Sequence, residues 1–219
     1  MTIRNLIKLA CAILLALTIF AMKKSGNSGK FVVEKSAQHV VPFRLLSKGN
    51  KRFATGFYLN YNKKNYIVTN RHVCDANKKV YGHDNIQFGD YVGKIIAIDV
   101  IHDLCLVTSN RKDGLELAKE DLKELDKVYL IGFPRGLGKT IREGRMVEEL
   151  NIFAPWLDGQ IVDTQMISTT AYGGNSGSPV LNDQGKVAGV LFTGSRYIHT
   201  EGYIVPLTYL KLFLVMYAR

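Results

Sequence analysis

The residues most suggestive of chemistry are a serine set among glycines. Ser176 lies in the segment 172–179, which reads YGGNSGSP. Glycine adopts backbone conformations that other residues avoid, so this segment can form a tight turn that directs N–H groups and the serine hydroxyl to one point. A nucleophile with an oxyanion hole needs that arrangement. An ordinary glycine-rich turn between two strands has the same composition, so the segment alone leaves both interpretations open.

A serine hydroxyl is a weak nucleophile at neutral pH, so it needs a base, and the base needs a group that fixes its tautomer. His72 follows an apolar run and a short polar turn, and Asp103 directly precedes the apolar run 104–107. A carboxylate beside a buried strand is costly unless it accepts hydrogen bonds, and orienting a histidine supplies one. Taken singly, His72 also fits a surface turn and Asp103 a turn former.

Two neighbours of Asp103 compete for the same roles. Asp99 is the weaker candidate for the acid because no apolar strand follows it directly. His102 would face away from Asp103 if side chains alternate along a strand there. The sequence therefore favours His72, Asp103 and Ser176 acting together.

Other hydrolase chemistries lack the residues that they need. A Ser-x-x-Lys acylase would need lysine where Pro179 stands, and a nucleophile elbow would need glycine where Ser178 stands. The sequence contains no His-Glu-x-x-His and no paired CxxC, so a zinc hydrolase has no ligand set. We therefore expect neither a metal nor another cofactor.

The elements that must position these residues are predicted to be strands. From about residue 31, short apolar or alternating runs are bounded by glycine, asparagine and aspartate. Only 115–126, with leucines among charged residues, suggests a helix within this region, so there is no βαβ alternation and the predicted class is all-β. The pattern after Pro206 predicts a C-terminal helix over 207–218. The predicted strands are 38–46, 53–60, 64–69, 92–98, 103–108, 127–133, 139–149, 160–168, 178–182, 186–194 and 202–206.

Several short blocks together resemble the trypsin-like (chymotrypsin-fold) serine peptidases, in particular the compact bacterial branch of the high-temperature-requirement and glutamyl-endopeptidase type. The resemblance covers about residues 40–206, and His72, Asp103 and Ser176 follow the family's order. The blocks that carry it are ATGF at 54–57, TNRHV at 69–73, DLCLV at 103–107, IGFPRG at 131–136 and GNSGSP at 174–179.

This resemblance implies two antiparallel six-stranded β-barrels, about 31–115 and about 125–206, with the site in the cleft between them. It implies that Ser176 is the nucleophile, that His72 is the general base, and that Asp103 orients His72. The N–H groups of Gly174 and Ser176 would form the oxyanion hole. Three features depart from the family pattern. Ser178 stands where glycine is usual, Cys105 stands where a small alanine is frequent, and Tyr172-Gly173 lead into the turn of the nucleophile.

The resemblance also places a specificity pocket. Its predicted substrate-binding residues are Thr170 at the base, Phe192, Thr193 and Gly194 along a wall, and Gly202 at the back. None is a carboxylate, and an incoming lysine or arginine would need one because an unpaired buried charge is costly. We expect a small or medium apolar residue there. His199 together with Thr170 keeps an acidic preference as the alternative.

The composition is that of a globular chain with a basic surface. The 219 residues include 29 Lys+Arg and 19 Asp+Glu, a net charge of +10, with 47% hydrophobic residues. The cations are spread in singles and pairs and no nucleic-acid-binding motif accompanies them, so we expect no dedicated nucleic-acid site. Cys74 and Cys105 lie in apolar surroundings, where we expect buried free thiols, with one bridge between them as the alternative.

The N-terminus has the pattern of an export signal. Arg4 and Lys8 precede the apolar segment 9–22, and Lys23 and Lys24 follow it. As a helix the segment would span about 21 Å, short of a bilayer core of about 30 Å. We expect residues 1–30 to be a signal peptide cleaved after Ala21, or an uncleaved signal anchor, followed by a flexible tether.

Together these observations predict an exported serine endopeptidase, periplasmic, extracellular or membrane-anchored, that cleaves polypeptides through an acyl-enzyme. The alternative is a non-catalytic peptide-binding or chaperone-like module on the same fold. The presence of His72, Asp103 and Ser176 favours the enzyme, because a pseudo-enzyme is expected to lose at least one of them. Because the sequence ends at Arg219, we expect no appended peptide-binding domain. The sequence does not indicate an oligomeric state.

Overall fold

The computed structural model describes residues 30–47, 49–154, 159–195, 198 and 200–218, together with the single residue 13. Except for residues 13 and 30, the predicted signal segment and tether lie outside the described residues, as does His199. Within the described part of the chain, no helix has the length and apolar character needed to cross a bilayer.

The first half of the chain forms a closed six-stranded antiparallel barrel. The strands run in the order β1-β2-β3-β6-β5-β4, and the pair Phe43 and Phe88 joins β1 to β4 and closes the barrel. Side chains alternate between the interior and solvent along β4 and β5, as a half-buried strand requires. The strands are β1 (Val40–Ser47), β2 (Asn50–Tyr61), β3 (Lys64–Thr69), β4 (Asn85–Phe88), β5 (Tyr91–Asp99) and β6 (Leu104–Thr108).

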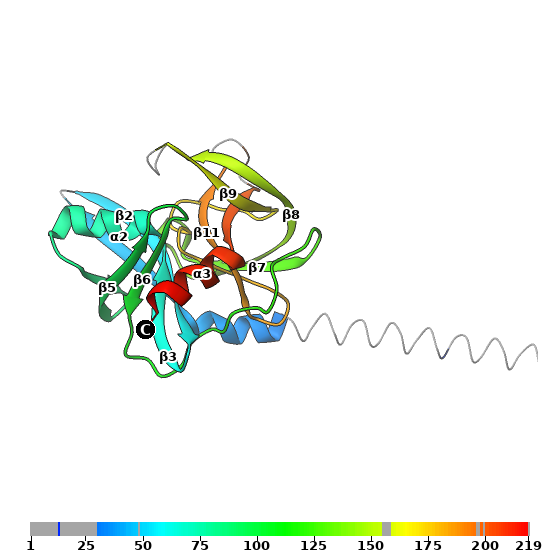
Figure 1. The fold of residues 1–219 in the computed structure, drawn as a ribbon, viewed down its shortest axis with the longest axis horizontal. Coiled ribbons are helices and arrows are strands. Elements are labelled where there is room, and N and C mark those ends of the chain that lie inside the picture. The colour runs from blue at the N-terminus through cyan, green and yellow to red at the C-terminus, as the bar shows by residue number, and fades with distance from the viewer. Residues whose placement is uncertain are drawn as a thin grey trace, which may run out of the picture.

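The second half repeats this architecture. Its closed barrel has the order β10-β11-β12-β9-β8-β7. The long hairpin of β8 and β9 forms one side of this barrel (Figure 1). The strands are β7 (Lys127–Gly132), β8 (Thr140–Ala154), β9 (Gln160–Ile167), β10 (Pro179–Leu181), β11 (Val187–Gly194) and β12 (Gly202–Pro206).

Two α-helices whose ends are both described pack against the barrels. Helix α2 (Arg71–Tyr81) follows β3 and ends at Gly82, whose φ of +72° forms a left-handed cap. Helix α3 (Leu207–Tyr217) follows β12 and packs on β11 and β12 of one barrel and on β5 and β6 of the other. Residues 30–36 are also helical, and the short 3-10 turns are η1 (Ala37–His39) and η2 (Pro134–Gly136).

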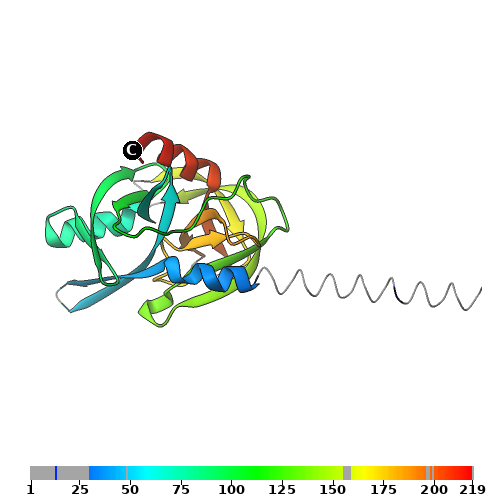
Figure 2. The ribbon, with the colours of Figure 1, turned by 90° about the horizontal axis from the view of Figure 1, so that it is seen from below.

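A shared core joins the two barrels. It contains Phe57 and Leu104 from the first barrel, Tyr129 and Val190 from the second, and Phe213 from α3, each almost completely buried. Figures 1 and 2 show α3, coloured red, lying over the junction. Burial of apolar surface at this junction fixes how the barrels meet.

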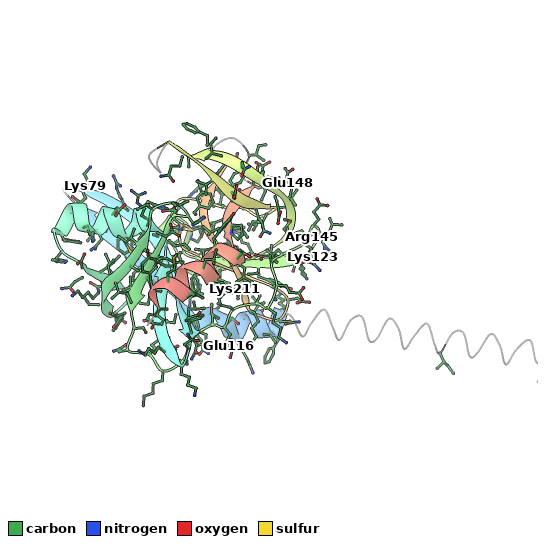
Figure 3. All side chains as sticks on the ribbon, in the orientation of Figure 1. Lys79, Glu116, Lys123, Arg145, Glu148 and Lys211 are labelled. Carbon is green, nitrogen blue, oxygen red and sulfur yellow. A yellow bond between two sulfur atoms is a disulfide. The ribbon has the colours of Figure 1, made fainter. Side chains whose placement is uncertain are left out.

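The charged side chains are dispersed over the surface. Lys79, Glu116, Lys123, Arg145 and Glu148 are exposed on α2, on connecting loops and on β8 (Figure 3). This distribution matches the scatter of charges along the sequence.

The all-β class and the C-terminal helix are confirmed, but two local predictions are wrong. Residues 115–126 contain no helix, because the backbone of the segment bonds in extended form to a strand of each barrel: Leu115 bridges to Leu59 and Leu117 to Val187. Helix α2 is missing from the prediction, because only Val73, Cys74 and Asn77 in it are buried and its overall apolar content is low, although its apolar residues lie on one face.

The expectation of free thiols is also wrong. Cys74 and Cys105 form a disulfide with an S–S distance of 2.08 Å, which links α2 to β6. Each cysteine lies two residues beyond a member of the His72–Asp103 pair described below, so the contact that joins that pair also brings the sulfur atoms together. Both cysteines point into the core of the first barrel, as expected.

Candidate active site

The turn that carries Ser176 lies between β9 and β10 and depends on two glycines. Gly174 has φ +100° and Gly177 has φ +81°. A Cβ on Gly174 would lie 2.5 Å from the carbonyl oxygen of Phe133, and one on Gly177 would lie 2.1 Å from that of Thr55. Positive φ and close backbone contact therefore require glycine at both positions.

Hydrogen bonds hold this turn in a single shape. The N–H groups of Asn175, Gly177 and Ser178 donate to the carbonyls of Tyr172 (3.0 Å), Leu191 (2.8 Å) and Asn175 (2.9 Å), respectively. The N–H groups of Gly174 and Ser176 donate to no backbone carbonyl among the described residues. Both N–H groups therefore remain available as donors, and an oxyanion hole requires such free donors.

His72 and Asp103 are brought together as the sequence predicts. Nδ1 of His72 lies 2.7 Å from Oδ2 of Asp103, and the backbone N–H of His72 donates to Oδ1 at 2.9 Å. The carboxylate is fully buried, whereas the imidazole remains one-third exposed. A carboxylate on Nδ1 favours the tautomer that leaves Nε2 as a proton acceptor.

The backbone of Asp103 is fixed as tightly as its side chain. Its φ of +55° lies in the left-handed region, which aspartate enters more readily than most residues. Its carbonyl accepts from the N–H of Arg71 at 3.1 Å and from Nδ2 of Asn70 at 3.0 Å. Residues at the start of α2 therefore hydrogen-bond to both the side-chain carboxylate and the backbone carbonyl of Asp103.

Asp99 and His102 pair with each other, apart from the His72–Asp103 contact. Nδ1 of His102 lies 2.9 Å from Oδ2 of Asp99, and Oδ1 accepts from the N–H groups of Ile101 and His102. Burial raises the pKa of Asp99, but these hydrogen bonds outweigh burial and hold the pKa below its usual range. The His102 ring stacks on Tyr209 of α3, with ring centroids 4.1 Å apart.

The serine turn docks on the first barrel close to His72. The N–H of Thr55 in β2 donates to the carbonyl of Ser176 at 2.8 Å, and the Thr55 hydroxyl donates to the carbonyl of Gly174 at 2.8 Å. Gly177 packs against Thr69, three residues before His72. Thr55 and Thr69 thus connect the serine of one barrel to the histidine of the other, a role that their sequence blocks did not reveal.

The Ser176 hydroxyl donates to the carbonyl of Phe192 at 3.4 Å, a long hydrogen bond. Among the described residues, no hydrogen bond joins Ser176 to His72. Catalytic hydrogen bonds are often long or misaligned before substrate binds, and the hydroxyl can turn about one side-chain bond.

The unusual Ser178 is accommodated beneath the turn. Its side chain is fully buried, and a Cβ on Gly132 would lie 2.1 Å from its Oγ. The glycine at the end of β7 therefore leaves the space that this extra hydroxyl occupies.

A cavity of about 260 Å³ opens beside Ser176. Of the predicted pocket residues, Thr193 and Gly194 line it, whereas Thr170, Phe192 and Gly202 do not. The side chain of Phe192 is buried in the core, and only its carbonyl faces Ser176. Gly202 of β12 pairs with Gly194 of β11. The lining is Ala171, Tyr172, Gly173, Ser176, Leu191, Thr193, Gly194 and Ser195, with no carboxylate among these residues.

Arg135 borders this pocket and was not expected there. It has φ +56° in η2, and its N–H donates to the carbonyl of Gly173 at 2.6 Å. Its guanidinium lies 4.4 Å from the ring centroid of Tyr172. The sequence gives no signal for a charge beside this pocket, apart from the loop in which Arg135 lies.

Comparison with known proteins gives the same family as the sequence blocks. The family model for the trypsin-like peptidase domain matches residues 54–190. Protease Do-like 2 of Arabidopsis thaliana is 32% identical over 162 residues, covering 70% of this chain and 26% of the relative. The magnetosome formation protease MamE of Paramagnetospirillum magneticum is 27% identical over 161 residues, covering 68% and 22%. The chain thus spans about a quarter of the length of these curated relatives.

Solved structures share the fold. The active form of the Rv3671c protease of Mycobacterium tuberculosis superposes with a TM-score of 0.69 at 23% identity, covering 84% of this chain and 82% of that one. The serine endoprotease of Yersinia pestis gives a TM-score of 0.64 at 19% identity, covering 86% and 65%. With the family model matching well over half of the chain, this protein belongs to the trypsin-like peptidase family.

Proposed function

We propose that the protein is a serine endopeptidase with Ser176 as nucleophile, His72 as general base and Asp103 as the residue that orients His72. The observation that carries the proposal is the double contact of Asp103 with His72, at 2.7 Å and 2.9 Å, on the barrel that receives the Ser176 turn. A buried carboxylate that hydrogen-bonds to both the ring and the backbone N–H of one histidine fixes the tautomer and the orientation of the imidazole.

The reaction follows from these positions. Nε2 of His72 takes the hydroxyl proton as Oγ of Ser176 attacks the carbonyl carbon of the scissile peptide. The N–H groups of Gly174 and Ser176 stabilise the negative oxygen of the tetrahedral intermediate. His72 then donates the proton to the departing amine, which leaves an acyl-enzyme, and water activated by the same histidine releases the acid.

The substrate in this proposal is a polypeptide with a small or medium apolar residue in the 260 Å³ pocket. Ala171, Leu191 and Gly194 give the pocket apolar walls, and no lining residue is acidic. Several similar proteins are named as proteases, which supports a peptide substrate. We further propose that the protein is exported, because basic residues precede the apolar segment 9–22.

A fluorophosphonate probe tests the assignment, since it labels only an activated serine. We expect the full chain to be labelled and Ser176→Ala to be unlabelled. Ser178→Ala is the matched control, because that buried serine lies two residues away in the same turn and should leave labelling unchanged. Labelling that survives Ser176→Ala would refute the nucleophile, and an unlabelled wild type would favour the peptide-binding alternative.

A further inference from the structure

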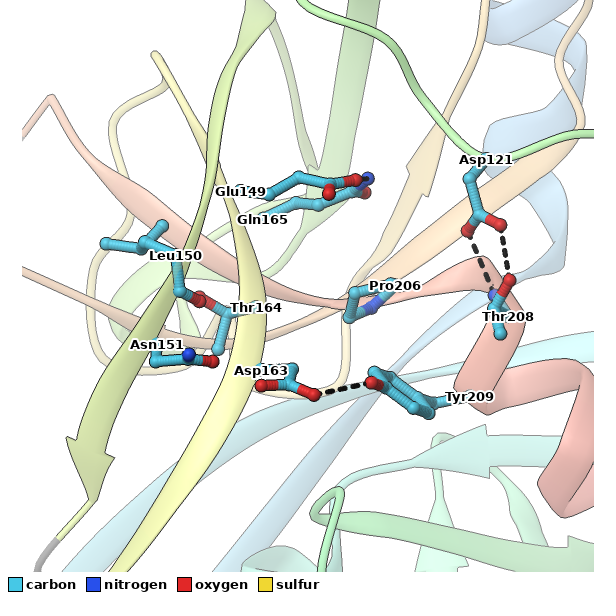
Figure 4. A pocket seen from close by; sticks show the side chains of 10 residues that line it. All are labelled: Asp121, Glu149, Leu150, Asn151, Asp163, Thr164, Gln165, Pro206, Thr208 and Tyr209. Atoms are coloured by element: carbon cyan, nitrogen blue, oxygen red, sulfur yellow. Dashed lines mark hydrogen bonds between the residues drawn. The ribbon is translucent and has the colours of Figure 1, made fainter.

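A second cleft lies between the β8–β9 hairpin and the start of α3 (Figure 4). It has a volume of about 400 Å³. Glu149 and Gln165 pair across the two strands and point the same way, facing the end of α3 that carries Thr208 and Tyr209. The lining is Asp121, Glu149, Leu150, Asn151, Asp163, Thr164, Gln165, Pro206, Thr208 and Tyr209.

The cleft is acidic in a basic protein. Asp121, Glu149 and Asp163 line it, and no lysine, arginine or histidine does, although the chain carries a net charge of +10. Among the described residues none of the three carboxylates forms an ion pair. Three carboxylates around one hollow, none of them in an ion pair, favour the binding of a cation.

The donors that these carboxylates do bind are neutral. Asp121 accepts from the N–H of Thr208 at 2.9 Å and from the hydroxyl of the same threonine. Asp163 accepts from the hydroxyl of Tyr209 at 2.6 Å, and this bond raises the pKa of Tyr209, so the phenol stays protonated. The carboxylates are thus held in place by donors that do not neutralise them.

Gln165 supplies an unused acceptor in the wall of the same cleft. Its Nε2 donates to Oε1 of Glu149 at 3.0 Å and to the carbonyl of Leu122 at 3.3 Å, which fixes the amide orientation. Its Oε1 is buried and has no partner among the described residues, and the residue as a whole is only 1% exposed. An unpaired buried acceptor is costly, so a ligand that brings an N–H donor to Oε1 would stabilise this site.

We propose that this cleft binds an organic cation, that is, a primary ammonium or guanidinium group on an apolar stem. Such a group supplies both a positive charge and several N–H donors. Leu150 and Pro206 offer apolar surface for the methylene stem, in the way that lysine and arginine stems pack on proteins. The described residues contain no cluster of three metal-ligating side chains, which favours an organic ligand over a metal ion.

One aromatic contact connects the cleft to the chain segment just before Asp103. Tyr209 lines the cleft and stacks on His102, the residue directly before Asp103. A bound cation would therefore lie near the turn that holds the aspartate.

Isothermal titration calorimetry tests the proposal on the full chain carrying Ser176→Ala, which prevents self-cleavage. The probes are spermidine and N-acetyl-argininamide, titrated at low and at physiological ionic strength, because attraction to exposed carboxylates weakens with salt. The cleft variant is Glu149→Gln with Asp163→Asn, in which each amide keeps an acceptor oxygen. The matched control is Glu120→Gln with Glu124→Gln, which removes the same charge from exposed positions outside the cleft.

We expect saturable binding that weakens about tenfold or more in the cleft variant and stays within about twofold in the control. Binding of both probes would identify a general organic-cation site. Binding of the arginine derivative alone would identify a site for basic peptide side chains, and binding of spermidine alone would identify a polyamine site. No saturable binding at low salt, or equal losses in both variants, would overturn the proposal. If circular dichroism shows the double variant misfolded, Glu149→Gln alone, which keeps the Tyr209–Asp163 bond, replaces it.

Discussion

At the scale of single residues, the site depends on which carboxylate reaches His72. Asp99 and Asp103 are four positions apart, and both bind a histidine through Nδ1. Only Asp103 binds the histidine that lies on the barrel surface receiving the Ser176 turn. The left-handed backbone of Asp103 aims its side chain at the start of α2.

Replacing Asp103 should therefore affect catalysis far more than stability. We expect Asp103→Asn to lower kcat by about 10⁴-fold, because an amide at Nδ1 permits the wrong tautomer of His72. Initial rates of peptide hydrolysis measure kcat. Asp99→Asn is the matched control, and its kcat should fall by less than about tenfold. Equal losses in the two variants would mean that Asp103 has no special role.

Asp99 should instead contribute to the pH dependence of the free energy of unfolding. Its pKa is lowered in the folded protein, so the ionised form favours folding, and this stabilisation is present above the unfolded pKa and lost as pH falls through the folded one. We expect Asp99→Asn to cost about 1 kcal/mol at pH 7, with the difference vanishing in acid below the usual carboxyl range. Urea unfolding at several pH values measures it. The exposed Asp183→Asn should stay within about 0.5 kcal/mol throughout.

The pocket residues predict cleavage specificity. An uncharged lining of about 260 Å³ should accept small and medium apolar side chains and exclude lysine and arginine, which need a buried partner. A peptide library analysed by mass spectrometry should show cuts after such apolar residues. Dominant cutting after basic residues would mean that a different cavity receives the substrate.

At the scale of elements, the site is assembled where α2, β6 and the β9–β10 loop meet. The Cys74–Cys105 disulfide fastens α2 to β6 directly behind His72 and Asp103. A covalent link at this point limits how far the two elements can separate when the barrel fluctuates.

Removing this disulfide should destabilise the whole domain. With a sequence separation of 31, chain-entropy arguments give a loss of about 3 to 4 kcal/mol for Cys74→Ala with Cys105→Ala. Urea unfolding with and without reductant measures the loss, and Cys11→Ala is the control. Alkylation followed by mass spectrometry should find two additional thiols after reduction; the same thiol count before and after would contradict the bridge.

At the scale of the whole molecule, the two barrels are held by one shared core and by α3 across their junction. This arrangement places the residues of the proposed reaction on both sides of that junction: His72 and Asp103 belong to the first barrel and Ser176 to the second.

We expect the folded body to lie outside the cytoplasm. Arg4 and Lys8 precede the apolar run and favour retention of the N-terminus on the cytoplasmic side, a bias that Lys23 and Lys24 weaken. Adding an external protease to spheroplasts should degrade the body of the protein. Protection of the body in intact spheroplasts, with degradation only after lysis, would reverse the orientation.

Much of the fold could be predicted because strand alternation and turn residues are local signals. All of the predicted strands, from 38–46 to 202–206, overlap observed ones, but β4 (Asn85–Phe88) was missed because four residues give too short a pattern. Residues 115–126 look helical in isolation yet lie extended, since hydrogen bonds to both barrels outweigh local propensity.

The sequence by itself determined the all-β class and the terminal helix, because these depend on local periodicity. It also predicted the set of His72, Asp103 and Ser176, because their residue types occur in a fixed order, but it kept Asp99 as a rival to Asp103. Only the tertiary structure decided that Asp103 rather than Asp99 binds His72, that Cys74 and Cys105 are bridged, and that Ala171, Tyr172 and Ser195 line the pocket in place of Thr170 and Gly202. Those outcomes depend on distances between segments far apart in the chain. Such distances are set by barrel closure and by packing at the junction, which no local pattern encodes.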